Sequence, residues 1–370
     1  MRIGIDVRKI KDFGIGVYIE NLVKNLLLLD QQNEYLLFFR PQDADDFAFP
    51  EDRVQKVINR SGKYSLSEHL TLSWQSRRKG IDVFFSPHYV MPLFLTCKKV
   101  VTIHDLIHLK FPQFFPRPGA GLYAKFMFQQ TVKHADKIIA DSENTKKDIC
   151  RILGVDPAKI EVIYPAVDEE FSRFQDGERV REFRSRYRIE TDYILYVGSE
   201  KPHKNLKNTL LAFSIVAHRT DLNLVIRGAS LKKNEELWQT FCDLKLQDRT
   251  IVLDFIPKEE LPLLYAGAEL LVFPSLYEGF GFPVLEAFSC GTPVVTSNRS
   301  SIPEVAGDAA FLVDPQDVDA IAEGILTVLH DPQLKGSLIE KARNRAELFS
   351  WKASAEKTLE VFGDIVEGNR

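Results

Sequence analysis

LLVFPSLYEGFGFPVLEAFSCGTPVVT, from Leu270 to Thr296, contains a complete strand–helix–strand pattern. The apolar runs Leu270–Phe273 and Pro293–Thr296 predict two strands. Pro283 suits the first turn of a helix between them, and Gly291 lies near the end of that helix. Strands that alternate with helices are typical of parallel pairing, so this stretch predicts an α/β fold with a parallel sheet.

The same alternation runs through both halves of the chain. Predicted helices such as Val17–Leu29, Asn144–Leu153 (after the candidate N-cap Ser142) and Leu206–Ala217 lie between short apolar runs. In the first half the predicted strands are Arg2–Val7, Tyr35–Phe39, Val54–Ile58, Val83–Phe85, Val100–Ile103, Ile138–Ala140 and Val162–Ile163. In the second half they are Tyr193–Val197, Leu222–Ile226, Ile251–Leu253, Leu270–Phe273, Pro293–Thr296 and Ala310–Val313.

Polar, irregular sequence separates the halves at Tyr164–Glu178, which we interpret as a hinge linker. A chain of 370 residues is too long for one ordinary core. We therefore predict two doubly wound Rossmann-like domains, residues 1–168 and 169–351, that face a central cleft holding the ligand. Periodicity alone does not decide whether the last helix, Trp351–Val366, caps the second domain or crosses back to the first.

The composition argues against several classes of protein. The chain is 45% hydrophobic and 27% charged, as is ordinary for a soluble globular protein. Its net charge of -4 offers no general attraction to nucleic acid. We find no secretory signal and no apolar run long enough to span a membrane. The four cysteines are far apart, which favours reduced thiols in a cytoplasmic protein.

Two carboxylates, Glu278 and Glu286, lie in the opening stretch among mostly apolar residues, where carboxylates need partners. Gly279 and Gly281 leave backbone N–H groups exposed beside the helix start, which favours an anion such as phosphate. Carboxylates also accept hydrogen bonds from the vicinal hydroxyls of a sugar. Phosphate and polyol together describe a nucleotide sugar. The alternative is that Glu286 only favours the helix dipole and Glu278 is simply exposed.

Three other segments follow predicted strands. Gly14 and Gly16 precede a helix, but Ile19 replaces the third glycine of a dinucleotide fingerprint, so a tight turn is an equal alternative. His104 is the first residue after a strand, where catalytic groups collect; a structural histidine is the alternative. Its spacing to His108 suits a metal only on a helix, and the segment instead leads into FPQFFPRP.

Lys204, in the third segment KPHKN, precedes a predicted helix. A cation at a helix N-terminus opposes the helix dipole unless an anion neutralises it. A phosphate ligand and a solvated lysine are equal alternatives on this evidence.

Together these motifs resemble the retaining glycosyltransferases of the GT-B fold, in particular glycosyltransferase family 4. The resemblance covers nearly the whole chain, and the E-x7-E spacing of Glu278 and Glu286 is its most specific part. It is carried by the first glycine loop, the His-Asp after an inner strand, IIADSENTKKDI, YVGSEKPHKNL, LLVFPSLYEGFGFPVLEAFSCGTPVV and the final FSW. The resemblance implies an N-terminal acceptor domain, a C-terminal nucleotide-sugar domain, and a C-terminal helix, about 352–370, that crosses back to the first.

The resemblance also implies a role for each matching residue. Glu286 would hold the ribose hydroxyls, Glu278 would contact the transferred sugar, and Lys204 would neutralise the departing diphosphate. His104 would contact the transferred sugar near the reacting carbon. Backbone contacts with the donor would come from Phe280, Gly281 and, in the first domain, Gly16.

One position departs from the family pattern. Many members carry an arginine directly after the glycine that ends the second domain's first strand, where this chain has Ser199 after Gly198. Arg227, at the end of the next predicted strand, is the first candidate to replace that cation, and Lys201 is a weaker one.

The resemblance implies front-side attack by the acceptor hydroxyl, with the departing phosphate taking the proton and no metal required. SPHYVMPL and VVTIHDLIHLKFPQFF are similar to bacterial polysaccharide and O-antigen mannosyltransferases. The expected donor is therefore GDP-mannose, with UDP-hexoses next, and the expected acceptor is a glycan or lipid-linked glycan. Two interpretations fit a further segment of the first half. It either contacts the acceptor or the inner face of a membrane, or it is a solvated amphipathic helix. Its residues are Tyr64, His69, Trp74, Arg77 and Arg78.

Three rival functions follow from the same residues. A glycan phosphorylase or sucrose-type synthase is the nearest enzyme on this fold. A non-catalytic nucleotide-sugar-binding subunit is a rival from another class, against which the presence of His104, Lys204 and both glutamates argues. An oxidoreductase is disfavoured because Ile19 breaks the dinucleotide glycine pattern.

Overall fold

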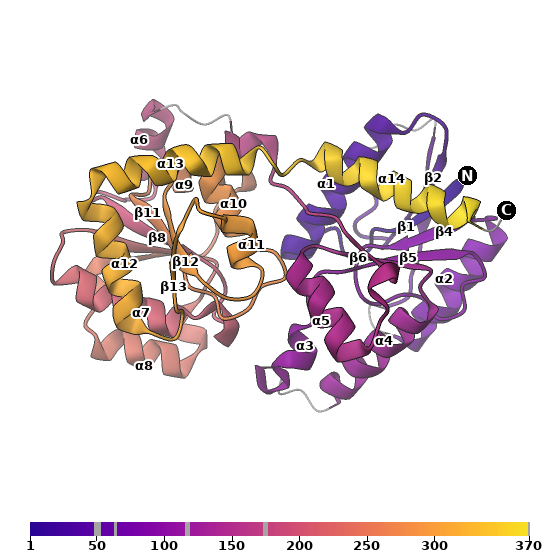
Figure 1. Cartoon of the computed structure of the whole chain (residues 1–370), viewed down its shortest axis with the longest axis horizontal. Coiled ribbons are helices and arrows are strands. Elements are labelled where there is room, and N and C mark those ends of the chain that lie inside the picture. Colours follow the sequence, from indigo (N-terminus) through magenta and orange to yellow (C-terminus); the bar gives the residue numbers. More distant parts are fainter. Residues whose placement is uncertain (48–52, 63–64, 115–118, 173–176, 369–370) are drawn as a thin grey trace. The chain divides into compact units, whose positions relative to one another are not determined.

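The computed structural model describes residues 1–47, 53–62, 65–114, 119–172 and 177–368. The chain divides into two units, residues 1–166 together with 350–370, and residues 167–349 (Figure 1). Each unit holds one parallel sheet with helices packed against it. The predicted architecture of two doubly wound domains is therefore confirmed.

Seven parallel strands form the sheet of the first unit in the order β3-β2-β1-β4-β5-β6-β7. The chain winds outward from β1 in one direction and from β4 in the other, so the topological switch point lies between these two strands. The strands are β1 (Arg2–Asp6), β2 (Glu34–Phe39), β3 (Val54–Ile58), β4 (Val83–Ser86), β5 (Lys98–Ile103), β6 (Lys137–Ala140) and β7 (Ile160–Val162). The helices are α1 (Phe13–Leu29), α2 (Leu66–Arg78), α3 (Ile107–Lys110), α4 (Ala120–His134), α5 (Glu143–Leu153) and α14 (Trp351–Glu367).

Helices cover both faces of this sheet. Phe84 of β4 packs into a core that also contains Leu72 of α2 and Phe128 of α4. The next residue, Phe85, points to the opposite face, where its ring meets Phe362 of α14 edge-on with 5.5 Å between the centroids. There α14 packs beside α1 (Figure 1). The C-terminal helix thus belongs to the first unit, as the resemblance implied.

A buried charged cluster lies at the switch point of this sheet. Arg8 donates two 2.8 Å hydrogen bonds to the carboxylate of Asp6 and one of 3.3 Å to Glu68 in the first turn of α2. His88, just after β4, has Nε2 3.3 Å from Asp6, and its Nδ1 accepts a hydrogen bond from the N–H of Val90. The four charged or titratable side chains are at most 4% exposed. Because buried charges persist only when paired, the cluster fastens α2 to the sheet.

We expect His88 to make the first unit sensitive to mild acid. Burial and the nearby charge of Lys9 lower the pKa of His88 from 6.5 to about 4. The unfolded chain therefore takes up a proton on His88 below pH 6.5 while the folded chain does not, so stability falls as the pH falls from 6.5 towards 4. The expected loss from this group is about 2 kcal/mol between roughly pH 7 and pH 5.

Urea unfolding of the wild type and of His88→Gln at these two pH values checks this prediction. The difference in unfolding free energy between the two pH values should shrink by about 2 kcal/mol in the variant. An equal pH dependence in both proteins contradicts the neutral, buried state of His88.

Six parallel strands form the sheet of the second unit in the order β10-β9-β8-β11-β12-β13. They are β8 (Tyr193–Val197), β9 (Asn223–Arg227), β10 (Thr250–Leu253), β11 (Leu270–Phe273), β12 (Val294–Ser297) and β13 (Phe311–Val313). The helices are α6 (Gly177–Arg186), α7 (Leu206–Ala217), α8 (Glu235–Asp243), α9 (Leu261–Ala266), α10 (Phe282–Ser289), α11 (Ile302–Ala306), α12 (Val318–His330) and α13 (Pro332–Ala346). The bounds of β8, α7 and β11 are the predicted ones, and α10 has Pro283 in its first turn as expected.

Two expectations about helix starts are wrong. Helix α1 begins at Phe13 rather than Val17, so Gly14 and Gly16 lie in its first turn and not in a preceding loop. Glycine disfavours helices, which is why the sequence pattern predicts a later start, but the Gly16 N–H reaches the carbonyl of Asp12 at 2.6 Å. Helix α6 begins inside the segment that we interpreted as a linker.

Candidate active site

The switch point of the second sheet lies between β8 and β11, since the chain runs outward from β8 to β10 and returns on the other side of β8. Ligands of open α/β sheets bind outside the carboxyl ends of the strands at such a point. The loop after β8 carries Lys204, and the loop after β11 carries Glu278. Topology therefore brings together two predicted site residues that are 74 positions apart in the chain.

Lys204 and Glu278 form an ion pair. The Nζ atom of Lys204 donates to the two carboxylate oxygens of Glu278 at 2.8 and 2.9 Å. The side chains are 21% and 11% exposed, so a ligand from solvent can reach both. Each charge has a partner before a ligand arrives, and an anionic ligand must compete with Glu278 for the lysine.

Asn205 holds the Lys204 loop against the Glu278 loop. Its backbone is left-handed, with φ 60°, at the N-cap of α7, a conformation that asparagine tolerates. Its side-chain amide donates to the carbonyls of Pro274 at 2.9 Å and Pro315 at 2.6 Å. Pro274 begins the loop after β11, so Asn205 ties the two site loops together. The sequence motif around Lys204 includes Asn205 but does not indicate this role.

Glu286 lies about one turn into α10, where its carboxylate accepts a 2.5 Å hydrogen bond from the hydroxyl of Tyr265. Burial raises the pKa of Glu286, against the opposing effects of the Tyr265 bond and the positive charge of Arg227. Arg227 ends β9, and its Nε atom is buried without a hydrogen-bond partner in the described part of the chain. A polar ligand that accepts a hydrogen bond from this Nε atom would supply the missing partner and stabilise the complex.

Gly281 shapes the start of α10. Its φ of 123° is one that other residues rarely adopt, and a Cβ atom there would lie 2.7 Å from Cδ1 of Ile302. The ring of the preceding Phe280 is buried and meets the rings of Phe282 and Phe349 edge-on. The N-cap residue of α10 is Gly281, which has no side chain to cap the helix, so the first N–H groups can bind an anion as the sequence predicts.

Two family models match the chain, one in each unit. Residues 14–171 match the model of Glycosyltransferase Family 4, and residues 180–345 match that of Glycosyl transferases group 1. The chain is a glycosyltransferase that is similar to family 4. The Lys204–Glu278 pair and Glu286 lie within the second match, and Gly16 and His104 lie within the first.

Curated relatives of this glycosyltransferase include two enzymes of O-antigen chains. It is 28% identical over 365 residues to O-antigen chain mannosyltransferase B of Escherichia coli, covering 94% of this chain and 95% of that protein. It is 30% identical over 231 residues to O-antigen chain mannosyltransferase RfbU of Salmonella typhimurium, covering 62% of this chain and 60% of that protein.

Solved structures share the fold of the glycosyltransferase. Sucrose-phosphate synthase from Thermosynechococcus elongatus is similar with a TM-score of 0.80 at 18% identity, over 100% of both chains. Anabaena HepE in complex with UDP and glucose is similar with a TM-score of 0.78 at 18% identity, over 98% of this chain and 99% of that one. These likenesses establish the GT-B fold, which sequence analysis predicted.

In the first unit of the glycosyltransferase, His104 is held at both ring nitrogens. Its Nδ1 lies 2.6 Å from the carboxylate of Asp141, and its Nε2 lies 3.0 Å from the carbonyl of Pro87. Both partners offer acceptor oxygens, so both ring nitrogens are placed to donate, as in the protonated ring. Burial lowers the pKa of His104, but the Asp141 carboxylate outweighs burial and the pKa is raised. Contact of His104 with a sugar remains a prediction, and it requires one of these bonds to be exchanged.

Gly16 packs against its own loop. A Cβ atom on this residue would lie 2.2 Å from the carbonyl oxygen of Ile10. The close approach of two backbone segments therefore explains the glycine, as the tight-turn alternative has it. Its contact with a phosphate remains a prediction.

The residues expected to contact an acceptor or a membrane differ in their exposure. Tyr64 lies outside the described residues. His69 is 3% exposed and on the face of α2 that packs inward, so its expected surface contact is wrong. Trp74 is 60% exposed, and the guanidinium of Arg78 lies 5.3 Å from its ring centroid. Arg77 is exposed beside them.

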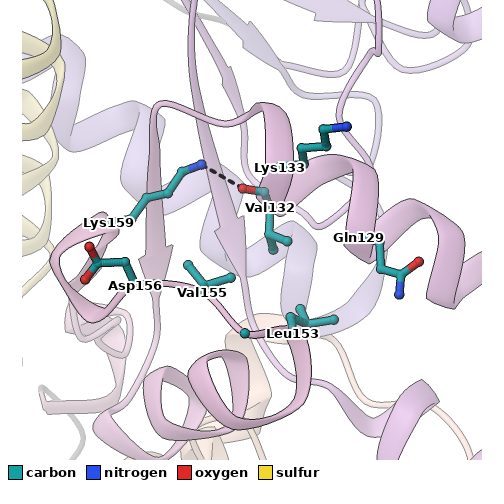
Figure 2. A pocket seen from close by; sticks show the side chains of 8 residues that line it. Gln129, Val132, Lys133, Leu153, Val155, Asp156 and Lys159 are labelled. Carbon is teal, nitrogen blue, oxygen red and sulfur yellow. Dashed lines mark hydrogen bonds between the residues drawn. The ribbon is translucent and has the colours of Figure 1, made fainter.

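A surface pocket of the first unit lies away from the carboxyl ends of the strands. Figure 2 shows its lining residues, where Lys159 donates to the carbonyl of Val132 at 2.7 Å. They are Gln129, Val132, Lys133, Leu153, Gly154, Val155, Asp156 and Lys159. These residues precede β6 and β7, so the pocket lies at the amino ends of the strands, whereas His104 lies at the carboxyl ends. Its lining contains no predicted site residue.

Within the described ranges, no three His, Cys, Asp or Glu side chains could together hold a metal ion. His108 lies in α3, whereas His104 lies before it. The described helices also include none long and apolar enough to cross a bilayer.

Proposed function

We propose that this glycosyltransferase moves mannose from GDP-mannose to a hydroxyl of a glycan or lipid-linked glycan acceptor, with retention of configuration and without a metal cofactor. The O-antigen mannosyltransferases among its relatives support the sugar and the kind of acceptor. The observation that carries the donor site is the Lys204–Glu278 pair at the switch point of the second sheet.

Lys204 supplies positive charge to the departing diphosphate. When the donor binds, a phosphate oxygen replaces a Glu278 oxygen at Nζ, and the carboxylate of Glu278 turns to the hydroxyls of the sugar. Negative charge grows on the diphosphate as the glycosyl bond breaks, and Lys204 and the N–H groups at the start of α10 stabilise it. The pair thus links recognition of the sugar to stabilisation of the leaving group.

The other end of the donor contacts α10 and β9. Glu286, oriented by the hydroxyl of Tyr265, accepts hydrogen bonds from the ribose. Arg227 replaces the cation that the family often carries where this chain has Ser199. The acceptor hydroxyl attacks on the side from which the diphosphate leaves, and a departing phosphate oxygen takes its proton. A second carboxylate on the opposite face of the sugar, as in hydrolases, is then not required.

A thermal-shift panel of GDP, UDP and ADP compounds tests the donor. At concentrations about a hundred times the dissociation constant, the true donor should stabilise the protein by about 3 kcal/mol. We expect the largest shifts with GDP and GDP-mannose. If only the UDP compounds raise the melting temperature, the donor is a UDP-hexose and the assignment of GDP-mannose is wrong.

The rival enzymes are separated by their products. A phosphorylase releases sugar phosphate when given a glycan and free phosphate, whereas the proposed enzyme releases GDP. The fold shared with sucrose-phosphate synthase does not decide between them, since one fold hosts many reactions. A binding subunit would bind GDP-mannose without releasing GDP.

We also propose that α2 brings the enzyme to an anionic membrane surface. Leu70 and Trp74 are one turn apart and 61% and 60% exposed, with Arg77 and Arg78 at the end of the same helix. The acidic residue of α2, Glu68, is buried in the charged cluster, so the exposed side chains of this helix include apolar and basic ones but no carboxylate.

Cosedimentation with vesicles of anionic phospholipid tests this contact. Trp74→Ala should reduce the bound fraction several-fold, because the indole ring is lost together with its contact to Arg78. Phe255→Ala, which removes a 77% exposed aromatic ring from the second unit, is the matched control. Equal binding by both variants and the wild type contradicts the proposal.

A further inference from the structure

The loop between β12 and α11 has an unusual backbone. Ser300 has a φ of 61°, in the left-handed region that non-glycine residues seldom occupy. Such strain persists only where surrounding contacts impose it, and it is often found at functional sites. The contacts around Ser300 show what imposes it here.

Ser300 binds both backbone groups of Glu278. Its hydroxyl accepts a hydrogen bond from the Glu278 N–H at 3.1 Å and donates to the Glu278 carbonyl at 2.6 Å. The hydroxyl of Ser301 lies 3.0 Å from the same carbonyl and 2.7 Å from the carbonyl of Phe280. Ser301 is fully buried, so these bonds are shielded from water.

The first residue of α11 lies against the end of the turn. Ile302 is fully buried, and its Cδ1 atom occupies the space that a side chain on Gly281 would need. Ser300, Ser301 and Ile302 therefore contact this turn at Glu278, Phe280 and Gly281. These contacts supplement the glycines in holding the turn.

Glu278 is thus held from two directions. Its backbone is fixed by serine hydroxyls after β12, and its carboxylate is held by Lys204 after β8. The ion pair with Lys204 must break when an anionic ligand binds the lysine, whereas the serine hydrogen bonds to the Glu278 backbone can stay in place. Because its backbone stays fixed, the Glu278 carboxylate remains within reach of the ligand after it leaves Lys204.

We propose that Ser300 and Ser301 are positioning residues, whose hydroxyls fix the backbone from Glu278 to Gly281 so that the carboxylate and the turn's N–H groups meet the donor sugar and diphosphate in one arrangement. The inference rests on the proposed assignment of Glu278 to the donor site. The serines themselves do not touch the donor.

Ser300→Gly separates this role from ordinary stability. Glycine adopts a φ of 61° without strain, so the variant loses the hydroxyl but relieves the backbone. Ser300→Ala loses the same hydroxyl and keeps the strain. Ser214→Ala removes a hydroxyl that bonds only within α7, to the carbonyl of Leu211, and is the matched control.

The test is titration calorimetry of these variants with GDP-mannose and with GMP, together with their melting temperatures. We expect Ser300→Gly to melt within about 2 °C of the wild type and to bind GDP-mannose at least about tenfold more weakly, with GMP binding unchanged. Ser300→Ala should show the same loss of GDP-mannose affinity at a lower melting temperature, and Ser214→Ala should show no loss.

Wild-type affinity for GDP-mannose in Ser300→Gly overturns the inference, as does an equal loss for GMP, which would indicate a general distortion. If the wild type binds UDP-glucose instead, the same comparison is made with UDP-glucose and UMP, and only the donor assignment fails. A wild type that binds no nucleotide sugar contradicts the proposed function and, with it, this inference.

Discussion

Lys204→Ala lowers the rate of mannose transfer by at least about a hundredfold, the scale observed when an electrostatic contact to a developing negative charge is lost. The reason is that Lys204, which is paired with Glu278, is proposed to stabilise the departing diphosphate together with the start of α10. The measurement is GDP release from GDP-mannose in the presence of acceptor-bearing membranes. Normal turnover in a folded Lys204→Ala protein contradicts the assignment.

Two further variants sharpen this result. Lys207→Ala removes an exposed lysine of α7, the helix that follows Lys204; Lys207 is paired with Glu236, and the change should leave transfer unchanged. Glu278→Gln should lower transfer to a similar extent as Lys204→Ala, yet bind GDP more tightly than the wild type. The amide no longer competes for Lys204 or repels the phosphates, although it has lost the charge that binds the sugar.

Glu286→Gln weakens GDP binding by about ten- to a hundredfold, the cost of losing charged hydrogen bonds to the ribose. The same change should raise the stability of the protein without ligand at neutral pH. Burial raises the pKa of Glu286, so the folded state loses stability from this group as the pH rises above the unfolded value of 4.5. A neutral amide avoids that loss.

Calorimetry with GDP and urea unfolding at pH 7 test both halves of this prediction. Glu269→Gln is the control, because this residue is paired with Lys335 at the opposite end of β11. Tyr265→Phe should reduce GDP affinity less than Glu286→Gln, since it removes only the hydroxyl that orients the carboxylate. A Glu286→Gln protein that is less stable and binds GDP normally makes Glu286 a structural residue.

Much of the fold was predictable because its signals are local. The strand Leu270–Phe273 and the helix start at Pro283 follow from an apolar run and a proline within a few residues of each other. Helix α1 is the exception, because its first turn contains Gly14 and Gly16, whose helix propensity is low. Gly16 lies there against the backbone of Ile10, where a larger residue would not fit. The side of the sheet that the last helix covers is set by distant contacts and came only from the family resemblance.

The site divides in the same way. Lys204, Glu278 and His104 follow strand ends, a signal that the sequence carries; Asp141 follows β6 in the same manner and could have been found with it. The side chains that pair with these residues could not be predicted from the sequence. Tyr265 reaches Glu286 from another helix, and no local pattern indicates such a contact.

Anomeric analysis by NMR of the product formed from GDP-mannose and a lipid-linked glycan acceptor tests the central claim most directly. The account predicts an α-mannosyl product, because the mannose of GDP-mannose is α-linked and front-side attack preserves that configuration. A β-mannosyl product, or mannose released only to water, would contradict it.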